Sequence, residues 1–357
     1  MIDWAYVAVP FLVLPIVLLF RFVGCGNFTG SDAAPGPATG ANSTAPPDYD
    51  KYLMNVTPNP GPLKDASQVS KDDIIGYWRL VDDPSSPVAV DAKGYQNGTY
   101  VQGTEIAPQM PDANKLGGSE AAPGILVTGQ PSLIDATTND KKVMCRLFQG
   151  GYVIVPYKDG LYDGFAAGNF TIECWINVKW SQATKGYQHT LFFTGGHYQS
   201  PTEFAAQHNR LRVYADESNL WKVDVYPNPT PPHPDPLPVV LSTDVLVTFG
   251  ATTHLVVTLK KNAQALIEVS LWINGQNTQS DMNRSPATIV DCASPLGAPL
   301  LIGVTNTSPV DPQLTPTTVV PTQPILSEIQ EVVLYRRALS GPEILTHYRL
   351  NSPTGGY

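Results

Sequence analysis

The carboxylates best suited to acid–base chemistry in this sequence are two glutamates near its C-terminal end, Glu328 and Glu331. Hydrolysis of a glycosidic bond requires two carboxyl groups placed close together across that bond. The segment that contains them alternates like a strand, and side chains three positions apart on a strand point to opposite faces. This spacing argues against a catalytic pair, so we predict that the protein is not an enzyme and keep a glycoside hydrolase only as a remote alternative.

The histidines offer little further chemistry. His189, His197 and His208 fall between predicted strands and are expected at the surface or at strand edges, whereas His254 and His347 are expected to pack at a sheet and at the terminal helix. No Ser or Cys nucleophile has an obvious base partner. The sequence also lacks a P-loop and the helical zinc motif HExxH, which argues against nucleotide-driven and metalloprotease activity.

The four cysteines are Cys25, Cys145, Cys174 and Cys292. They include no CxxC pair and no Cys/His spacing that suits zinc, so thiolate metal binding is not expected. In an oxidising compartment we expect one disulfide among the last three cysteines, and the spacing leaves the pairing open.

Aromatic side chains are the other candidates for ligand contact, because a flat ring can stack on a sugar. Four of them lie in predicted loop or strand-edge contexts and are our predicted ligand-binding residues: Trp180, Tyr187, Tyr198 and Trp221. By contrast, Trp78, Trp175 and Trp272 are predicted to be packing residues.

The elements that would position these residues are mainly strands. Residues 170–178 alternate between one apolar face and a second, more polar face that contains Glu173 and Trp175, and we expect the second face to line a surface. Residues 266–275 repeat the alternation and end in Asn274-Gly275, which favours a type I′ hairpin turn. Further strands are predicted at 151–156, 188–194, 210–214, 254–259, 300–304 and 329–335.

One short helix is predicted after the last strand. Ser340 and Glu343 have the spacing of a capping box and precede an apolar pattern of Ile344, Leu345 and Tyr348. The density of breakers, with 34 Pro and 29 Gly, makes other long helices in the body unfavourable.

Four pieces of sequence, in order, resemble the laminin-G-like jelly-roll family of the concanavalin A-like lectin/glucanase superfamily. They are Gly76–Leu80 with Val90–Tyr100, then Phe170–Trp175, then His254–Thr258 with Leu271–Gly275, and finally Ile329–Ser340. The resemblance implies an all-β, two-sheet antiparallel jelly-roll sandwich over residues 71–352. Two Pro-rich stretches, near 226–238 and 305–324, depart from the family and are interpreted as insertions.

The resemblance also implies a structural calcium ion. Asp91 and Asn97 lie in the matching turn and Glu331 in the last strand, and such ions take carboxylate and carbonyl oxygens. Gln330 replaces an acidic residue that the family usually carries, which weakens this implication. The alternative is that Asp91 and Asn97 only shape the turn.

The N-terminal residues predict a membrane attachment. Residues 4–20 are apolar and carry no charge, so residues 1–24 are predicted to be a single transmembrane anchor or an uncleaved signal. Lipidation of Cys25 after cleavage is the alternative. Residues 25–70 are rich in Pro, Gly, Ser and Thr and are predicted to be a stalk. Arg21 alone would favour a cytoplasmic C-terminus, but the family resemblance implies a body outside the cytoplasm: periplasmic, at the cell surface or lumenal.

Charge excludes one class of partner. The net charge is −9 and the cations are scattered, so nucleic acid is not expected to bind. Our leading hypothesis is a membrane-anchored, non-catalytic recognition module that binds a glycan or a protein surface. The alternative is a structural accessory subunit of a membrane or envelope complex, held by its helix, stalk and Pro-rich loops.

Overall fold

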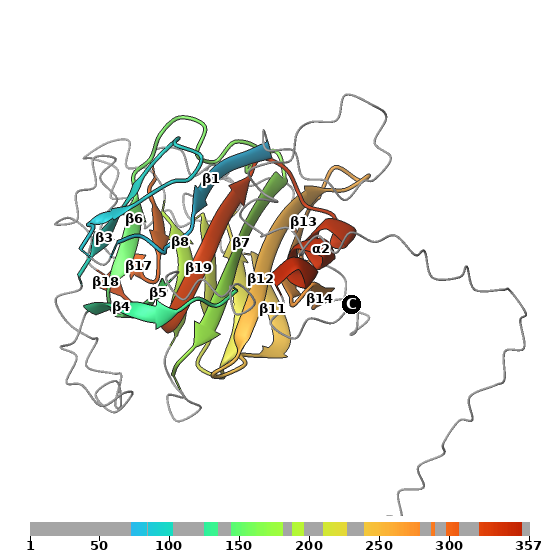
Figure 1. Cartoon of the computed structure of the whole chain (residues 1–357). Helices are drawn as coiled ribbons and strands as arrows, with labels where there is room; N and C mark the ends of the chain where they lie inside the picture. The colour runs from blue at the N-terminus through green and yellow to red at the C-terminus, as the bar shows by residue number, and fades with distance from the viewer. Residues whose placement is uncertain are drawn as a thin grey trace, which may run out of the picture. The chain divides into compact units, whose positions relative to one another are not determined.

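The computed structural model describes ten stretches of the chain, drawn as coloured ribbon in Figure 1: residues 73–83, 85–102, 125–134, 144–180, 188–195, 210–226, 239–278, 287–289, 298–306 and 321–351. The predicted anchor at residues 1–24 and the stalk at 25–70 lie outside these stretches. Within them, no helix combines the length and apolar character that crossing a membrane requires.

The larger sheet has nine strands, all paired antiparallel. Its main path is β14 (Gln276–Asn277), β13 (Ile267–Ile273), β12 (Thr252–Lys261), β7 (Asn169–Val178), β19 (Leu326–Tyr335), β5 (Met144–Gln149) and β4 (Ile125–Pro131). In addition, β1 (Ile74–Trp78) pairs with β19, and β15 (Ala287–Ile289) pairs with β13.

The smaller sheet has eight strands, also antiparallel, in the order β11 (Val239–Leu246), β10 (Leu220–Val225), β9 (Leu211–Ala215), β8 (His189–Thr194), β16 (Leu300–Ile302), β6 (Tyr152–Val155), β3 (Gly98–Val101) and β2 (Val88–Ala89). A separate two-stranded sheet joins β17 (Thr305–Asn306) to β18 (Pro321–Thr322), at the two ends of the second predicted insertion.

The main core lies between the two sheets. Alternate residues of β7, such as Phe170, Ile172 and Ile176, meet alternate residues of the smaller sheet, such as Val213 and Val223, and all five are buried. This alternation is the period of two that strands impose on side chains. The predicted all-β architecture of two antiparallel sheets and one short C-terminal helix is therefore confirmed.

The outer face of the larger sheet is also buried, which differs from our expectation for β7. Helix α2 (Gly341–Asn351) lies against this face near β12, β13 and β14 (Figure 1). A second apolar cluster there includes Trp175, Val256 and Ile344. The expectation that the second face of β7 lines a surface is wrong, because the alternation of one strand does not show that a distant helix covers it.

Two local predictions are confirmed. Asn274 and Gly275 have φ values of 52° and 78° and connect β13 to β14 as a two-residue turn. At the start of α2, the Glu343 carboxylate accepts hydrogen bonds from the backbone N–H of Ser340 at 2.8 Å and from its hydroxyl at 2.7 Å. The carboxylate therefore satisfies a backbone donor that the helix leaves free.

A bulge interrupts the central strand β19. Its register with β7 shifts between Gln330 and Val333, and Glu331 has a positive φ of 54°. Before the bulge β19 pairs with β5, and after it with β1. An extra residue in one strand resets which face the following side chains occupy.

Candidate functional site

The predicted aromatic platforms do not form a surface. Trp180 and Trp221 are 2% and 1% exposed and belong to the core between the sheets. The indole N–H of Trp180 donates to Asn219 Oδ1 at 2.9 Å, and its ring stacks on His189. The predictions for Trp180 and Trp221 as ligand-binding residues are therefore wrong. Their positions near strand edges in the sequence did not show that both rings point into the core. Tyr187 and Tyr198 lie outside the described residues.

Asp91 organises the turn that the family resemblance identified. Its carboxylate accepts four backbone N–H bonds, from Tyr77, Lys93, Tyr95 and Gln96, at 2.8 to 2.9 Å. Its own N–H donates to Asn97 Oδ1 at 2.9 Å. A carboxylate and an amide oxygen that are both occupied by backbone donors shape a turn, which is the alternative stated for these residues.

Glu331 is engaged elsewhere. Its carboxylate accepts hydrogen bonds from the hydroxyl of Tyr77, from Arg79 Nε at 3.2 Å and from Gln330 Nε2 at 3.1 Å. Because donors rather than empty space surround these oxygens and those of Asp91, the three predicted ligands do not fit a calcium ion. In the described part of the chain, no group of three or more His, Cys, Asp or Glu side chains is arranged to hold a metal. The structural calcium ion that the resemblance implies stays a prediction.

The two glutamates of the last strand share one face, contrary to the prediction from their spacing. Glu328 lies opposite Asn177, on the outer face of the larger sheet, and forms an ion pair with Lys179 at 3.0 Å. The bulge turns Glu331 to the same face, where Tyr77 also lies. A bulge is not visible in sequence spacing, which explains the error.

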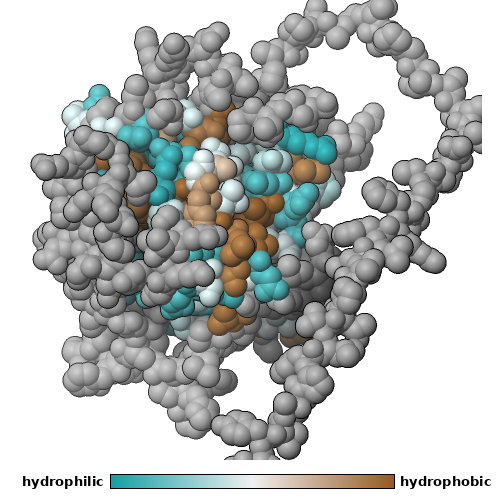
Figure 2. Space-filling view, turned by 90° about the horizontal axis from the view of Figure 1, so that it is seen from below, coloured by the Kyte–Doolittle hydropathy of each residue, from teal (hydrophilic) through white to brown (hydrophobic). Residues whose placement is uncertain are grey.

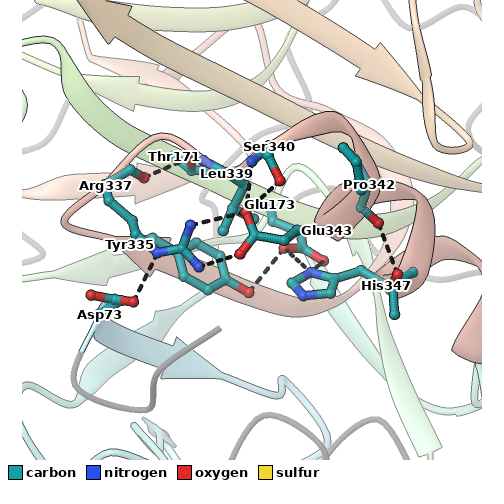
Figure 3. Close-up of polar contacts among 11 residues, drawn as sticks. Asp73, Thr171, Glu173, Tyr335, Arg337, Leu339, Ser340, Pro342, Glu343 and His347 are labelled. Carbon is teal, nitrogen blue, oxygen red and sulfur yellow. Dashed lines mark hydrogen bonds and ion pairs between the residues drawn. The ribbon is translucent and has the colours of Figure 1, made fainter. Parts of the chain in front are cut away.

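The largest dry polar group lies under α2, and we call it the helix-side cluster: Glu173, His254, Tyr335 and His347, all 0% exposed. Glu173 Oε2 accepts a hydrogen bond from Tyr335 at 2.9 Å (Figure 3). Glu173 Oε1 bonds to His254 Nε2 at 2.8 Å. His347 Nδ1 lies 3.0 Å from Oε2 and 3.1 Å from Oε1 of Glu173, so one carboxylate joins β7, β12, β19 and α2. The expected packing of both histidines is confirmed.

The electrostatics of the helix-side cluster fit a structural role. Burial alone would raise the pKa of Glu173, but the charge of His347 and the hydrogen bonds of both histidines outweigh it and hold that pKa well below its usual value. Burial lowers the pKa of His254. A fully enclosed carboxylate that is already bonded by three side chains has no access to a substrate.

The start of α2 is fastened to the same region. Arg337 donates to both oxygens of Glu343, at 2.6 and 3.0 Å, and to Asp73 at 2.8 Å (Figure 3). The hydroxyl of Thr171 donates to the carbonyl of Arg337 and accepts from the N–H of Leu339. These contacts tie the helix to β1 and β7 and close the outer face of the larger sheet.

A second polar group lies on the outer face of the smaller sheet, and we call it the Arg212 face: Gln188, Thr190, Arg212, Tyr214, Asp224 and Gln323. Arg212 Nη2 donates to Gln188 Oε1 at 2.7 Å and to Gln323 Oε1 at 2.6 Å. Its Nε donates to the Thr190 hydroxyl at 3.2 Å. All three acceptors are neutral, so they orient the guanidinium without cancelling its charge.

The remaining members complete a set of donors and acceptors around Arg212. Its guanidinium carbon lies 3.8 Å from the centre of the Tyr214 ring. The Tyr214 hydroxyl donates to Asp224 at 3.2 Å, and Asp224 lies directly opposite Arg212 on β10. Among the described residues, none accepts a hydrogen bond from Arg212 Nη1, and the side chain is half-buried. One donor nitrogen is therefore available to a ligand.

Burial also perturbs the acid of the Arg212 face. It raises the pKa of Asp224, and the charge of Arg212 opposes that rise. The sequence signal for this face was a pair of polar residues at alternate positions on each of two neighbouring strands: Arg212 and Tyr214 on β9, and Lys222 and Asp224 on β10. We missed it because β10 was not predicted, and without its partner strand neither pair suggests a shared surface.

Exposed apolar side chains do not add a site. In the described part of the chain, Val90, Val240 and Leu246 are the large apolar residues that are clearly exposed, at 48%, 46% and 55%. Figure 2 shows one face on which apolar residues form a band with polar residues on both sides. Such mixed surfaces are ordinary in soluble domains.

His189 and the cysteines correct two further expectations. His189 is 1% exposed rather than superficial, and burial lowers its pKa to about 4. Cys145 and Cys174 are both buried, at 1% and 0% exposed. They belong to the outer and inner clusters of the larger sheet respectively, so their thiols lie on opposite faces of that sheet. Cys292 lies outside the described residues.

Comparison with family models matches residues 149–345 to a laminin-G-like family described as the concanavalin A-like lectin/glucanases superfamily. No curated protein matches the sequence significantly.

Among solved structures, the chain is similar to a Trypanosoma rangeli sialidase in complex with sialic acid (14% identity, TM-score 0.45, 84% of this chain and 36% of that one). It is also similar to domain 4 of AbnA, an arabinanase from Geobacillus stearothermophilus, in complex with arabinotriose. The identity is 13%, the TM-score is 0.44, and the match covers 77% of this chain and 98% of that one. A third similar structure is the binding domain of Paraclostridial Mosquitocidal Protein 1. The identity is 11%, the TM-score is 0.42, and the match covers 78% of this chain and 52% of that one. Likenesses at this level say nothing about function, and the chain spans only about a third of the sialidase.

Proposed function

Because the match covers residues 149–345, more than half of its length, the chain belongs to the concanavalin A-like lectin/glucanase superfamily, and we propose that its body is a non-catalytic module that binds a glycan. The observation that carries this proposal is the Arg212 face: an oriented guanidinium with an open Nη1, next to a carboxylate and a tyrosine hydroxyl.

The chemistry of this face suits a sugar. Two neighbouring hydroxyls of a glycan present oxygens that accept from a guanidinium and protons that a carboxylate accepts, and Arg212 and Asp224 lie side by side in register. The amide Nε2 of Gln188 donates one N–H to Glu217 at 2.5 Å, and that of Gln323 donates one to Gln188 at 3.2 Å. Since each amide carries two N–H groups, each has a second one to offer a ligand. Because Arg212 and Asp224 stand on paired strands, they are held rigidly, and little ordering would oppose binding.

Support for a non-catalytic role comes from the acids of the larger sheet. Glu173 is bonded by three side chains, Glu328 by Lys179, and Glu331 by Tyr77, Arg79 and Gln330. Glycoside hydrolysis needs one carboxyl that can give a proton and a second that faces the sugar or a water. These three carboxylates are committed to partners within the protein.

We also propose that the body lies outside the cytoplasm and is attached to a membrane. The support is in the sequence, where an uncharged apolar segment at 4–20 precedes a Pro- and Gly-rich stretch. In this arrangement the recognition module reaches its ligand at a distance from the bilayer.

The test is binding of the full chain, extracted in mild detergent, to a glycan array. We expect saturable binding that Arg212→Lys weakens and Asp224→Asn weakens, because the first removes the planar fork and the second removes the charged acceptor. Lys260→Ala is the matched control, since it removes an exposed cation from the larger sheet.

Three results would redirect the proposal. Absence of glycan binding together with co-purification in fixed ratio with a membrane complex would favour the structural accessory subunit. Binding that none of the Arg212-face variants changes would place the ligand elsewhere on the module. Turnover of a bound glycan that depends on Glu328 or Glu331 would overturn the non-catalytic role.

A further inference from the structure

Three Asn-x-Ser/Thr triplets fall within the described residues or begin there, and the structure separates them by exposure. They are Asn97-Gly98-Thr99, Asn169-Phe170-Thr171 and Asn306-Thr307-Ser308. Asn97 and Asn169 are exposed, whereas Asn306 is 1% exposed. A glycan attached to asparagine is bulky and hydrated, so a folded domain accommodates it only where the side chain reaches solvent.

We infer that Asn97 and Asn169 are N-glycosylation sites when the chain enters a eukaryotic secretory pathway, and that Asn306 stays unmodified in the folded protein. The inference rests on the proposed location of the body outside the cytoplasm. The amide Nδ2 would attack the anomeric carbon of a polyprenyl-pyrophosphate-linked oligosaccharide. A C–N bond forms, the C–O bond to pyrophosphate breaks, polyprenyl pyrophosphate leaves, and the amide proton passes to a base of the transferase.

The geometry at Asn97 leaves the reacting nitrogen outside the fold. Asn97 Oδ1 accepts the N–H of Asp91 at 2.9 Å, which fixes the oxygen end of the amide towards the turn. Because the oxygen and nitrogen of an amide diverge by about 120°, Nδ2 does not point at the backbone group that Oδ1 contacts. The middle residue of the triplet, Gly98, is packed so closely that a Cβ there would lie 2.8 Å from Val153. The third residue, Thr99, is half-exposed.

Asn169 opens β7 at the end of the larger sheet. It lies opposite Lys260, which is exposed, and no described residue bonds its side-chain amide. The preceding residues form a turn closed by the N–H of Asn169 donating to the carbonyl of Gly164. A glycan at this position would project from the sheet edge without displacing a strand.

The hydroxyl of the Asn169 triplet imposes an order of events. Thr171 is 0% exposed in the folded protein, where its hydroxyl bonds to Arg337 and Leu339, the latter 168 residues further along the chain. Since the transferase must read the Thr side chain, Asn169 has to be modified before the segment leading into α2 docks. At synthesis rates of about 5–20 residues per second, that interval lasts roughly 10–30 s.

Asn306 has the opposite environment. It lies in β17, whose partner is β18, and it takes part in interactions with other residues. A glycan on this side chain would have to leave the interior of the protein, which would separate β17 from β18. Only chains that escape modification at Asn306 are therefore expected among folded molecules.

The test is expression of the full chain in a eukaryotic secretory cell, followed by glycopeptide mass spectrometry of the folded, protease-resistant fraction. We expect glycans at Asn97 and Asn169 and none at Asn306. Asn169→Gln should remove one glycan mass increment, Asn97→Gln another, and the double variant both. Thr99→Ala is a second variant for the first site, because it abolishes the triplet while keeping the bond between Asn97 and Asp91.

The triplets at Asn27, Asn42 and Asn55 distinguish failure of this inference from failure of the proposed location. Glycans on those residues with Asn97 and Asn169 both empty would overturn the inference and leave the location intact. A chain without glycans at any triplet would overturn both. Full occupancy of Asn306 in the folded fraction would contradict the argument from burial.

Discussion

The two sheets carry contrasting polar groups on their outer faces. The helix-side cluster is 0% exposed, and its carboxylate is bonded by two imidazoles and a phenol. In the Arg212 face, Gln188, Arg212 and Gln323 are half-buried, and the cation is held by neutral oxygens. Its other members are buried: Thr190, Tyr214 and Asp224, at 0%, 8% and 5% exposed. A dry group whose carboxylate is bonded by three side chains fixes the position of elements, whereas an oriented charge with a free donor can receive a ligand. The same sandwich therefore uses one outer face for stability and leaves the other for recognition.

The strongest challenge to this contrast is removal of the shared carboxylate. Glu173→Ala leaves His254, Tyr335 and His347 without their common partner in a dry site, so the free energy of unfolding should fall by about 3–5 kcal/mol. Urea unfolding followed by tryptophan fluorescence measures this change. Glu173→Gln, which keeps the shape and some hydrogen bonds, should lose less. If alanine cost under about 1 kcal/mol, the cluster would not be a stability element.

Acid should weaken the fold as a whole through its buried histidines, of which His189 lies in the smaller sheet and His254 in the larger one. The pKa of His189 in the folded protein is about 4, lowered by burial from a usual value near 6.5. The unfolded chain therefore binds a proton first, and the stability contribution, present above about pH 6.5, is lost as the pH falls towards 4. The loss should reach about 3 kcal/mol, and the lowered pKa of His254 acts in the same direction.

Urea unfolding at several pH values between 4 and 8 tests this dependence. In His189→Asn, the slope of stability against pH should flatten over the same interval, even though the variant starts from a lower stability. An unchanged slope would show that other groups are responsible for the acid sensitivity.

The Arg212 face should respond in the opposite way, with binding affected more than stability. Arg212→Ala removes a charged donor, and hydrogen bonds to charged groups contribute about 1.5–3 kcal/mol, so affinity for a bound glycan should fall roughly 10- to 100-fold. Titration calorimetry measures the affinity and urea unfolding the stability. A loss of stability as large as that of Glu173→Ala would remove the distinction between the two faces.

The smallest effect is expected at the beginning of α2. Ser340→Ala removes the hydroxyl that bonds Glu343 but keeps the backbone N–H bond to the same carboxylate, so stability should fall by about 1 kcal/mol. Thr346→Ala, on the exposed side of the same helix, is the control, since its hydroxyl bonds only to the carbonyl of Pro342. Equal effects of both variants would mean that the cap has no special role.

The sequence predicted local structure correctly where that structure depends on residues only a few positions apart. The positive φ of Asn274 and Gly275, the cap at Ser340 and the alternation of β7 follow from residue types within a few positions. The family resemblance added the architecture of two antiparallel sheets. The two histidines His254 and His347 were also expected to pack where they do.

Tertiary structure alone decided what each face of a strand meets. No local pattern shows that α2 covers Glu173, that a bulge turns Glu331 beside Tyr77, or that Arg212 and Asp224 become neighbours. These outcomes depend on pairings between residues far apart in the chain, and on one extra residue in a strand, which reverses the faces that follow it. The sequence by itself determined many of the elements but not β4, β5, β10 or β11, and the fold decided which polar groups were buried and which kept access to solvent.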